Sequence, residues 1–185
     1  MESNMKIWRI ISVLILLVAA VLFAGCGKPY IITDELKQPL QPGSACNMGS
    51  ITDELPSDFD PAKKPSAENI DKLKKYLSDA LVKKKVFSSF WTNNDDCLYE
   101  INGGILDYEK GSSFLRFMFG SLAGSARITV TLRLVDKKTN VIIFSGNFNG
   151  KVSSWQEEGD QMFQRVASNF AKELKKEMKK LNKTG

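Results

Sequence analysis

Residues 126–135 alternate between apolar and polar side chains, and this is the feature that most restricts the possible fold. The apolar set is Ile128, Val130, Leu132 and Leu134, and the polar set is Arg127, Thr129, Thr131 and Arg133. Because successive side chains of a strand point to opposite faces, a period of two predicts a β-strand with one buried face and one solvated face. The turn-forming residues 136–140 (DKKTN) then predict a hairpin, with residues 141–148 returning as the partner strand.

Two other segments repeat apolar residues at steps of three and four, which predicts amphipathic helices over residues 66–84 and 157–183. Ser66 is a favourable N-cap, and Glu68 follows in the first turn, where the helix dipole favours an acid. The predicted buried stripe of the second helix consists of Phe163, Val166, Ala167, Phe170, Leu174, Met178 and Leu181.

Residues 46–51 and 97–108 are predicted as two further strands, with Gly103 and Gly104 marking a bulge or a close approach. The resulting order is strand, helix, strand, strand, strand, helix. This order predicts an α+β domain, in which a mainly antiparallel sheet of about four strands carries two amphipathic helices on one face.

The N-terminal segment, residues 5–26, has the features of an export signal. Lys6 and Arg9 precede an apolar run over residues 10–23, and the small residues Ala24 and Gly25 lead into Cys26. The run is too short to span a bilayer comfortably but suits the core of a secretory signal. The alternative is an uncleaved membrane or amphipathic helix.

The sequence Leu22-Phe23-Ala24-Gly25-Cys26 resembles the bacterial lipobox, although Phe23 stands where an aliphatic residue is usual. The resemblance implies that Cys26 is lipidated and becomes the first residue of the mature protein. Two or more acyl chains are enough for stable anchoring. The resemblance further implies an outer-membrane lipoprotein that faces the periplasm, because Gly27 is not the Asp associated with retention in the inner membrane.

Cleavage there divides the chain into a lipoprotein signal peptide (1–25), a lipid-anchored flexible tether (26–45) and a periplasmic α+β domain (46–185). Three prolines and few periodic apolar residues predict that the tether is extended. About 20 residues at roughly 3.3 Å each could hold the domain up to about 65 Å from the bilayer.

The composition excludes several kinds of site. The 185 residues contain no His, which rules out Ser-His-Asp and Cys-His centres and His-ligated metals. The formal net charge of +5 is too small an excess to indicate a nucleic-acid partner. No catalytic residue, metal ligand or cofactor site is predicted, and we expect a protein that is not an enzyme.

The remaining cysteines, Cys46 and Cys97, form an even pair once Cys26 carries lipid. In an oxidising compartment they are predicted to form a disulfide that closes a loop of about 50 residues, worth about 4 kcal/mol. The alternative is two buried free thiols.

The Gly- and Ser-flanked segment 111–124 is crowded with apolar side chains but follows neither the strand nor the helix period. It is interpreted as a contact loop for self-association or a membrane, and the alternative is a buried strand or short helix that completes the core. The predicted contact residues are Phe114, Phe117, Met118, Phe119 and Leu122.

Six lysines in the last predicted helix could contact anionic lipid or cell-wall polymer: Lys172, Lys175, Lys176, Lys179, Lys180 and Lys183. Glu173 and Glu177 are interleaved with them, which favours an ordinary solvated helix face.

Residues 120–136 (GSLAGSARITVTLRLVD), the GNFNGKVSSW segment and the last helix resemble a family of uncharacterised bacterial lipoproteins with the domain of unknown function 4410. The order of elements is also similar to that of periplasmic domains in ring-forming secretion and wall-synthesis lipoproteins. These resemblances imply an adaptor or an oligomerising assembly subunit in envelope secretion, polymer export or wall maintenance, with a homo-oligomer or an envelope protein as partner. The alternative function is a periplasmic lipoprotein that binds a lipid or glycan.

Overall fold

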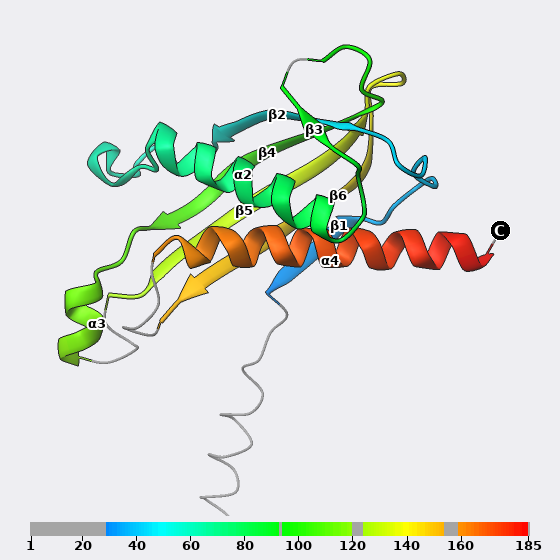
Figure 1. The fold of residues 1–185 in the computed structure, drawn as a ribbon. Helices are drawn as coiled ribbons and strands as arrows, with labels where there is room; N and C mark the ends of the chain where they lie inside the picture. Colours follow the sequence, from blue (N-terminus) through cyan, green and yellow to red (C-terminus); the bar gives the residue numbers. More distant parts are fainter. Residues whose placement is uncertain (1–28, 93, 120–123, 154–158, 185) are drawn as a thin grey trace, which may run out of the picture.

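The computed structural model describes residues 29–92, 94–119, 124–153 and 159–184 of the chain (Figure 1). A six-stranded sheet carries two long helices, α2 and α4, on one face. The strands are β1 (Tyr30–Asp34), β2 (Cys46–Asp53), β3 (Phe90–Trp91), β4 (Tyr99–Glu109), β5 (Ala126–Asp136) and β6 (Val141–Val152). The helices are α2 (Ala67–Lys83), the short α3 (Ser113–Phe119) and α4 (Gln161–Thr184), with a 3₁₀ turn at Pro61–Lys63.

The α+β class is confirmed, but the expectation of a mainly antiparallel sheet of about four strands is inexact, because the sheet has six strands. The strand order is β1-β6-β5-β4-β2-β3, and the sheet is mixed because β2 runs parallel to both β3 and β4. Helix α2 lies between β2 and β4 in the sequence, and a crossover of this kind brings the second strand back parallel to the first. The four strands β1, β6, β5 and β4 are antiparallel to one another in that order.

The alternating segment forms β5 as predicted, with Ile128, Val130, Leu132 and Leu134 buried. It pairs with β6 across the predicted hairpin, in a register that places Val130 opposite Phe148. Both predicted long helices are also confirmed. The side chain of Ser66 caps α2 by accepting a hydrogen bond from the backbone N–H of Asn69 at 3.3 Å.

The core lies between this helical layer and the sheet. From α4, the ring of Phe170 contacts Phe144 and Phe148 of β6, with ring centroids 5.7 and 5.2 Å apart. From α2, Leu73, Leu77 and Leu81 are fully buried. Aromatic pairs of this geometry add to the stabilisation that apolar burial provides.

The predicted tether over residues 26–45 is wrong for the part that the structure describes. Strand β1 pairs with β6 along the sheet edge, with Tyr30 opposite Phe148. Leu36 and Leu40 follow it and are each only 5% exposed, so the segment contributes to the core. The folded domain therefore begins at β1 rather than at residue 46. The prolines suggested an extended linker, but this segment folds because its apolar side chains are buried and its backbone pairs with the edge of β6.

Within the described residues, no helix is long and apolar enough to cross a membrane.

Candidate functional site

The predicted contact segment forms helix α3, which projects from the connection between β4 and β5 (Figure 1). Gly111 and Gly124 flank the projection with φ values of 70° and 68°, which glycine adopts without strain. The backbone N–H of Ser112 donates to the carbonyl of Gly124 at 2.8 Å, which closes the base of the projection. The Ser112 hydroxyl caps α3 by accepting from the N–H of Leu115 at 3.3 Å. The expected loop is therefore a short helix on a closed base.

Three of the five predicted contact residues lie on the surface of α3. Phe114, Phe117 and Met118 are 66%, 65% and 54% exposed. Phe119 is the last residue of α3, and Leu122 lies outside the described residues. Large apolar side chains gathered on one projection typically mark a contact surface.

A groove of about 720 Å³ lies between the start of α2 and the end of β4, next to the base of α3. The hydroxyl of Tyr108 accepts a hydrogen bond from Asn69 at 2.8 Å on its wall. Arg127 forms ion pairs with Asp107 at 3.1 Å and with Glu109 at 3.3 Å. Amide, hydroxyl and charged groups on a groove wall can bind a polar ligand.

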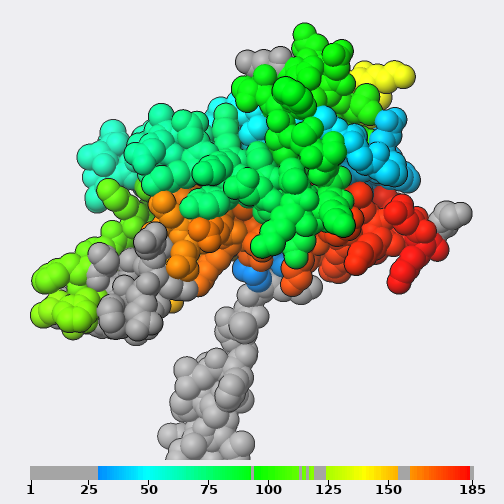
Figure 2. Space-filling model, viewed as in Figure 1, coloured from blue at the N-terminus to red at the C-terminus, as the bar shows by residue number. Residues whose placement is uncertain are grey.

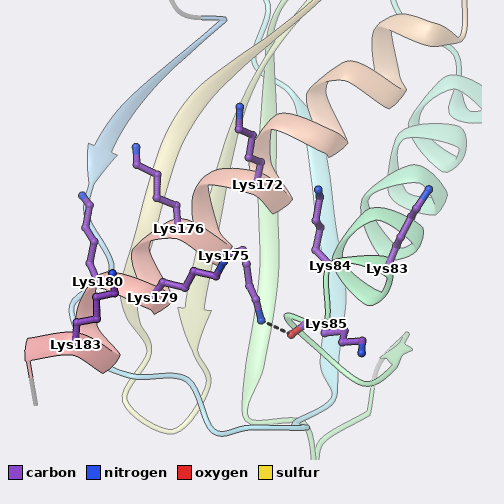
Figure 3. A pocket seen from close by; sticks show the side chains of 9 residues that line it. All are labelled: Lys83, Lys84, Lys85, Lys172, Lys175, Lys176, Lys179, Lys180 and Lys183. Carbon is purple, nitrogen blue, oxygen red and sulfur yellow. Dashed lines mark hydrogen bonds between the residues drawn. The ribbon is translucent and has the colours of Figure 1, made fainter.

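A second groove, of about 640 Å³, is lined by nine lysines, and this lysine groove has no other lining residue in the described part of the chain (Figure 3). Its walls are the end of α2 with the two residues that follow, and the C-terminal half of α4. The lining residues are Lys83, Lys84, Lys85, Lys172, Lys175, Lys176, Lys179, Lys180 and Lys183. The lysines of α4 were expected to form an ordinary solvated face, and the structure places a second cluster of lysines opposite them. The apolar stripes of α2 and α4 indicated that both helices pack on the core. Their packing side by side brings the lysines at the end of α2 next to those of α4.

Two buried carboxylates of α4, Glu173 and Glu177, form ion pairs with lysines of this groove. Glu173 accepts from Lys176 at 3.0 Å, and Glu177 pairs with Lys180 at 2.6 Å. Burial raises the pKa of Glu173, but the hydrogen bonds from Lys176 and Tyr30 and the charges of Lys176 and Lys172 outweigh it and lower that pKa overall. The carboxylate is therefore held ionised under the lysines.

Cys46 and Cys97 are both buried and both free thiols in the structure, so the predicted disulfide is not formed there. Burial raises the pKa of Cys46 far above its ordinary value, and the nearby charges of Cys97 and Glu100 raise it further. Burial also raises the pKa of Cys97. Cys46 lies opposite Tyr99 at the start of β4, two residues after Cys97, and the bond stays a prediction for an oxidising compartment.

Cys26, the predicted lipidation site, and the signal peptide before it lie outside the described residues. Among the described ranges there is no group of three or more Cys, Asp or Glu side chains placed to hold a metal ion.

The family model of the Domain of unknown function (DUF4410) matches residues 40–155. No curated protein matches the sequence. Two solved structures with a similar fold are crystal forms of the PelC dodecamer from Paraburkholderia phytofirmans. The first is a variant with one substitution, in space group C2. It matches with a TM-score of 0.59 and 10% sequence identity, and the match covers 79% of this chain and 95% of that chain. The form in space group P6 has a TM-score of 0.56 and 13% identity, covering 78% of this chain and 97% of that one. At such identities the likeness establishes a shared fold.

Proposed function

We propose that this chain, which belongs to the family defined by the DUF4410 domain, is a non-enzymatic outer-membrane lipoprotein that self-associates as an assembly subunit. Lipidated Cys26 would anchor it, and the domain would face the periplasm. Its role would lie in envelope secretion, polymer export or wall maintenance. The observation that carries the proposal is the exposed apolar surface of α3.

The surface of α3 is suited to a protein contact. Phe114, Phe117 and Met118 are each more than half exposed on one short helix. The closed base formed by Ser112 and Gly124 holds this helix away from the sheet and presents it to a neighbour. Burying aromatic side chains of this size stabilises an association through the hydrophobic effect.

The proposed occupant of this surface is a second copy of the chain. The fold is shared with subunits that the PelC structures show as dodecamers, which supports a homo-oligomer. In a ring of identical subunits, each copy presents one surface and receives another, so one projecting helix per subunit is sufficient.

The proposed anchor rests on the lipobox resemblance at Leu22–Cys26 together with the start of the fold. Only Gly27, Lys28 and Pro29 separate Cys26 from β1, which begins at Tyr30. Four residues span at most about 14 Å, so the domain would lie against the membrane rather than far from it.

The direct test replaces Phe114 and Phe117 with Ser and measures the mass of the protein by sedimentation. We expect the assembly to dissociate while the circular dichroism spectrum is unchanged, because both side chains are largely exposed in the single chain. The matched control replaces Val141 and Ile142 with Ser, since these are also exposed apolar residues, 47% and 37% exposed, but lie in β6. Unchanged assembly in the α3 variant would refute α3 as the contact.

A second function is favoured by the groove beside Tyr108: a periplasmic lipoprotein that binds a glycan or the polar part of a lipid. The groove's volume of about 720 Å³ is within the range of small-molecule sites. Native mass spectrometry of the purified protein would show a bound small molecule, and Tyr108→Phe with Arg127→Gln would release it. A spectrum of the protein alone would count against this function.

A further inference from the structure

The lysine groove carries a large local excess of positive charge. Nine lysines line it, and the carboxylates that pair with them are Glu35, Glu173 and Glu177. Those pairs involve only Lys176 and Lys180; within the described part of the chain, the other seven lysines form no ion pair with a carboxylate. Like charges held close together repel, so the surface is suited to an anionic partner.

Lys85, which lines the groove, has an unfavourable backbone conformation for a residue other than glycine. The N–H of Lys85 donates to Val82 and that of Val86 donates to Leu81, which is the Schellman ending of a helix. Lys85 has a φ of 55°, in the left-handed region that favours glycine. Its carbonyl accepts from Lys175 at 3.0 Å, which links the two walls (Figure 3). Lysine at a position suited to glycine is consistent with a use for its side chain.

The groove lies beside the point where the chain enters the fold. Tyr30 interacts with Glu173 of α4, which raises the pKa of Tyr30, and the charge of Lys176 also acts on it. Lys180 lies 3.7 Å from Glu35, just after β1. Figure 3 shows Lys176 and Lys180 extending from α4 towards β1, and Figure 2 shows the first described residues at the surface beside α4.

We propose that the lysine groove binds the phosphate headgroups of anionic phospholipids in the bilayer that holds Cys26. The proposal rests on the proposed lipid anchor, because an anchor at Cys26 places Tyr30 within about 14 Å of the bilayer. Electrostatic attraction falls off within about 8 Å at physiological ionic strength, so the groove lysines contribute only if the anchor holds them close to the bilayer surface. The flexible ammonium groups of lysine bind phosphate as point charges and need no fixed headgroup geometry.

The groove thus supplies a second attachment beside the acyl chains. A lipid anchor fixes one point of the domain, and a basic surface beside it fixes the orientation. In that orientation α4 lies over the membrane. An anionic polymer would bind the same charges without any need for them to lie next to β1, which is why the membrane is the partner that the geometry favours.

The test uses protein that starts at Gly27, which contains every described element but no lipid, so binding reports the groove and not the anchor. Co-sedimentation is measured with vesicles of equal parts phosphatidylglycerol and phosphatidylcholine, and with vesicles of phosphatidylcholine alone. We expect binding only to the anionic vesicles, with affinity that falls as salt rises.

The key variant reverses the charge of three groove lysines that form no ion pair with any described residue: Lys172→Glu, Lys179→Glu and Lys183→Glu. The matched control makes the same change in net charge with Lys75→Glu, Lys138→Glu and Lys151→Glu, which lie outside the groove. We expect about a tenfold or greater loss of vesicle binding for the groove variant and a much smaller loss for the control. If the glutamates unfold α4, the corresponding glutamine variant, checked by circular dichroism, replaces it.

Equal losses in both variants would overturn the proposal, because they would show a response to net charge alone. Release by inorganic phosphate, beyond that by chloride at equal ionic strength, would assign the groove to free phosphate. Tighter binding of alginate than of anionic vesicles would assign it to a polymer. None of these outcomes depends on self-association, which is measured separately by the mass of each variant.

Discussion

Tyr30, in the first strand of the fold, interacts with the buried carboxylate of Glu173 in the last helix, and this interaction raises the pKa of Tyr30 and lowers that of Glu173. Glu173 also accepts from Lys176 at 3.0 Å. The pKa of Tyr30 is raised, first by its interaction with Glu173 and then by burial. One carboxylate therefore connects the start of the fold, the helical layer and the lysine groove.

The first prediction concerns acid stability. Because the folded pKa of Glu173 lies below its ordinary value of 4.5, its contribution to stability is present above that pH and is lost as pH falls through the folded pKa. Glu173→Gln should lower the free energy of unfolding at neutral pH and make its decline in acid less steep. Urea denaturation at a series of pH values measures both effects. Glu68→Gln, at an exposed position, is the control, and identical pH profiles for Glu173→Gln and the natural protein would refute the role of this carboxylate.

The second prediction concerns the contact between β6 and α4. A Cβ on Gly150 would overlap the backbone carbonyl of Met162, so Gly150→Ala must push the helix from the sheet. We expect a loss of about 2 kcal/mol or more in the free energy of unfolding. Gly159→Ala is the matched control, because the atom nearest to a Cβ added at Gly159 would be 4.0 Å from it. A Gly150→Ala protein as stable as the control would contradict the packing described.

The third prediction concerns the backbone conformation of Lys85 at the end of α2 and its effect on the free energy of unfolding. Lys85→Gly should raise the free energy of unfolding by about 1 kcal/mol, because glycine adopts a φ of 55° without strain. Lys84→Gly should lower it, since Lys84 has right-handed helical dihedral angles. Thermal denaturation of both variants makes the comparison, and a destabilised Lys85→Gly would mean that the side chain supports the fold.

The fourth prediction concerns the thiols. Burial raises the pKa of Cys46 and Cys97, so neither should react readily with iodoacetamide in the folded protein at neutral pH. Unfolding protein that was produced in an oxidising compartment, without a reductant, then tests the predicted disulfide. A bridged pair stays unmodified until reductant is added, whereas modification of both cysteines would show that the bridge does not form.

Sequence periodicity predicted the elements that are specified by residues close together in the sequence. The β5–β6 hairpin and helix α2 follow from short-range alternation and from the cap at Ser66, and both are confirmed. Strand β1 was missed because it is only five residues long and its partner, β6, lies more than a hundred residues further along the chain. The parallel direction of β2 depends in the same way on a distant strand, β4, which no local pattern specifies.

For the two candidate surfaces, the sequence likewise showed the residues but not their arrangement in space. The apolar content of α3 was visible in the sequence, but its helical form depends on the base that Ser112 and Gly124 close. The lysines of α4 were also visible, and their interleaved glutamates indicated a solvated face. Only tertiary packing places Lys83, Lys84 and Lys85 opposite them.

The central claim is that the chain is an anchored, self-associating subunit. Light scattering in mild detergent gives the mass of the full-length lipidated protein, beside the soluble protein that starts at Gly27. We predict a discrete assembly of several copies, in at least the lipidated form, that the Phe114 and Phe117 substitutions reduce to a single chain. A single chain in both forms would contradict the account.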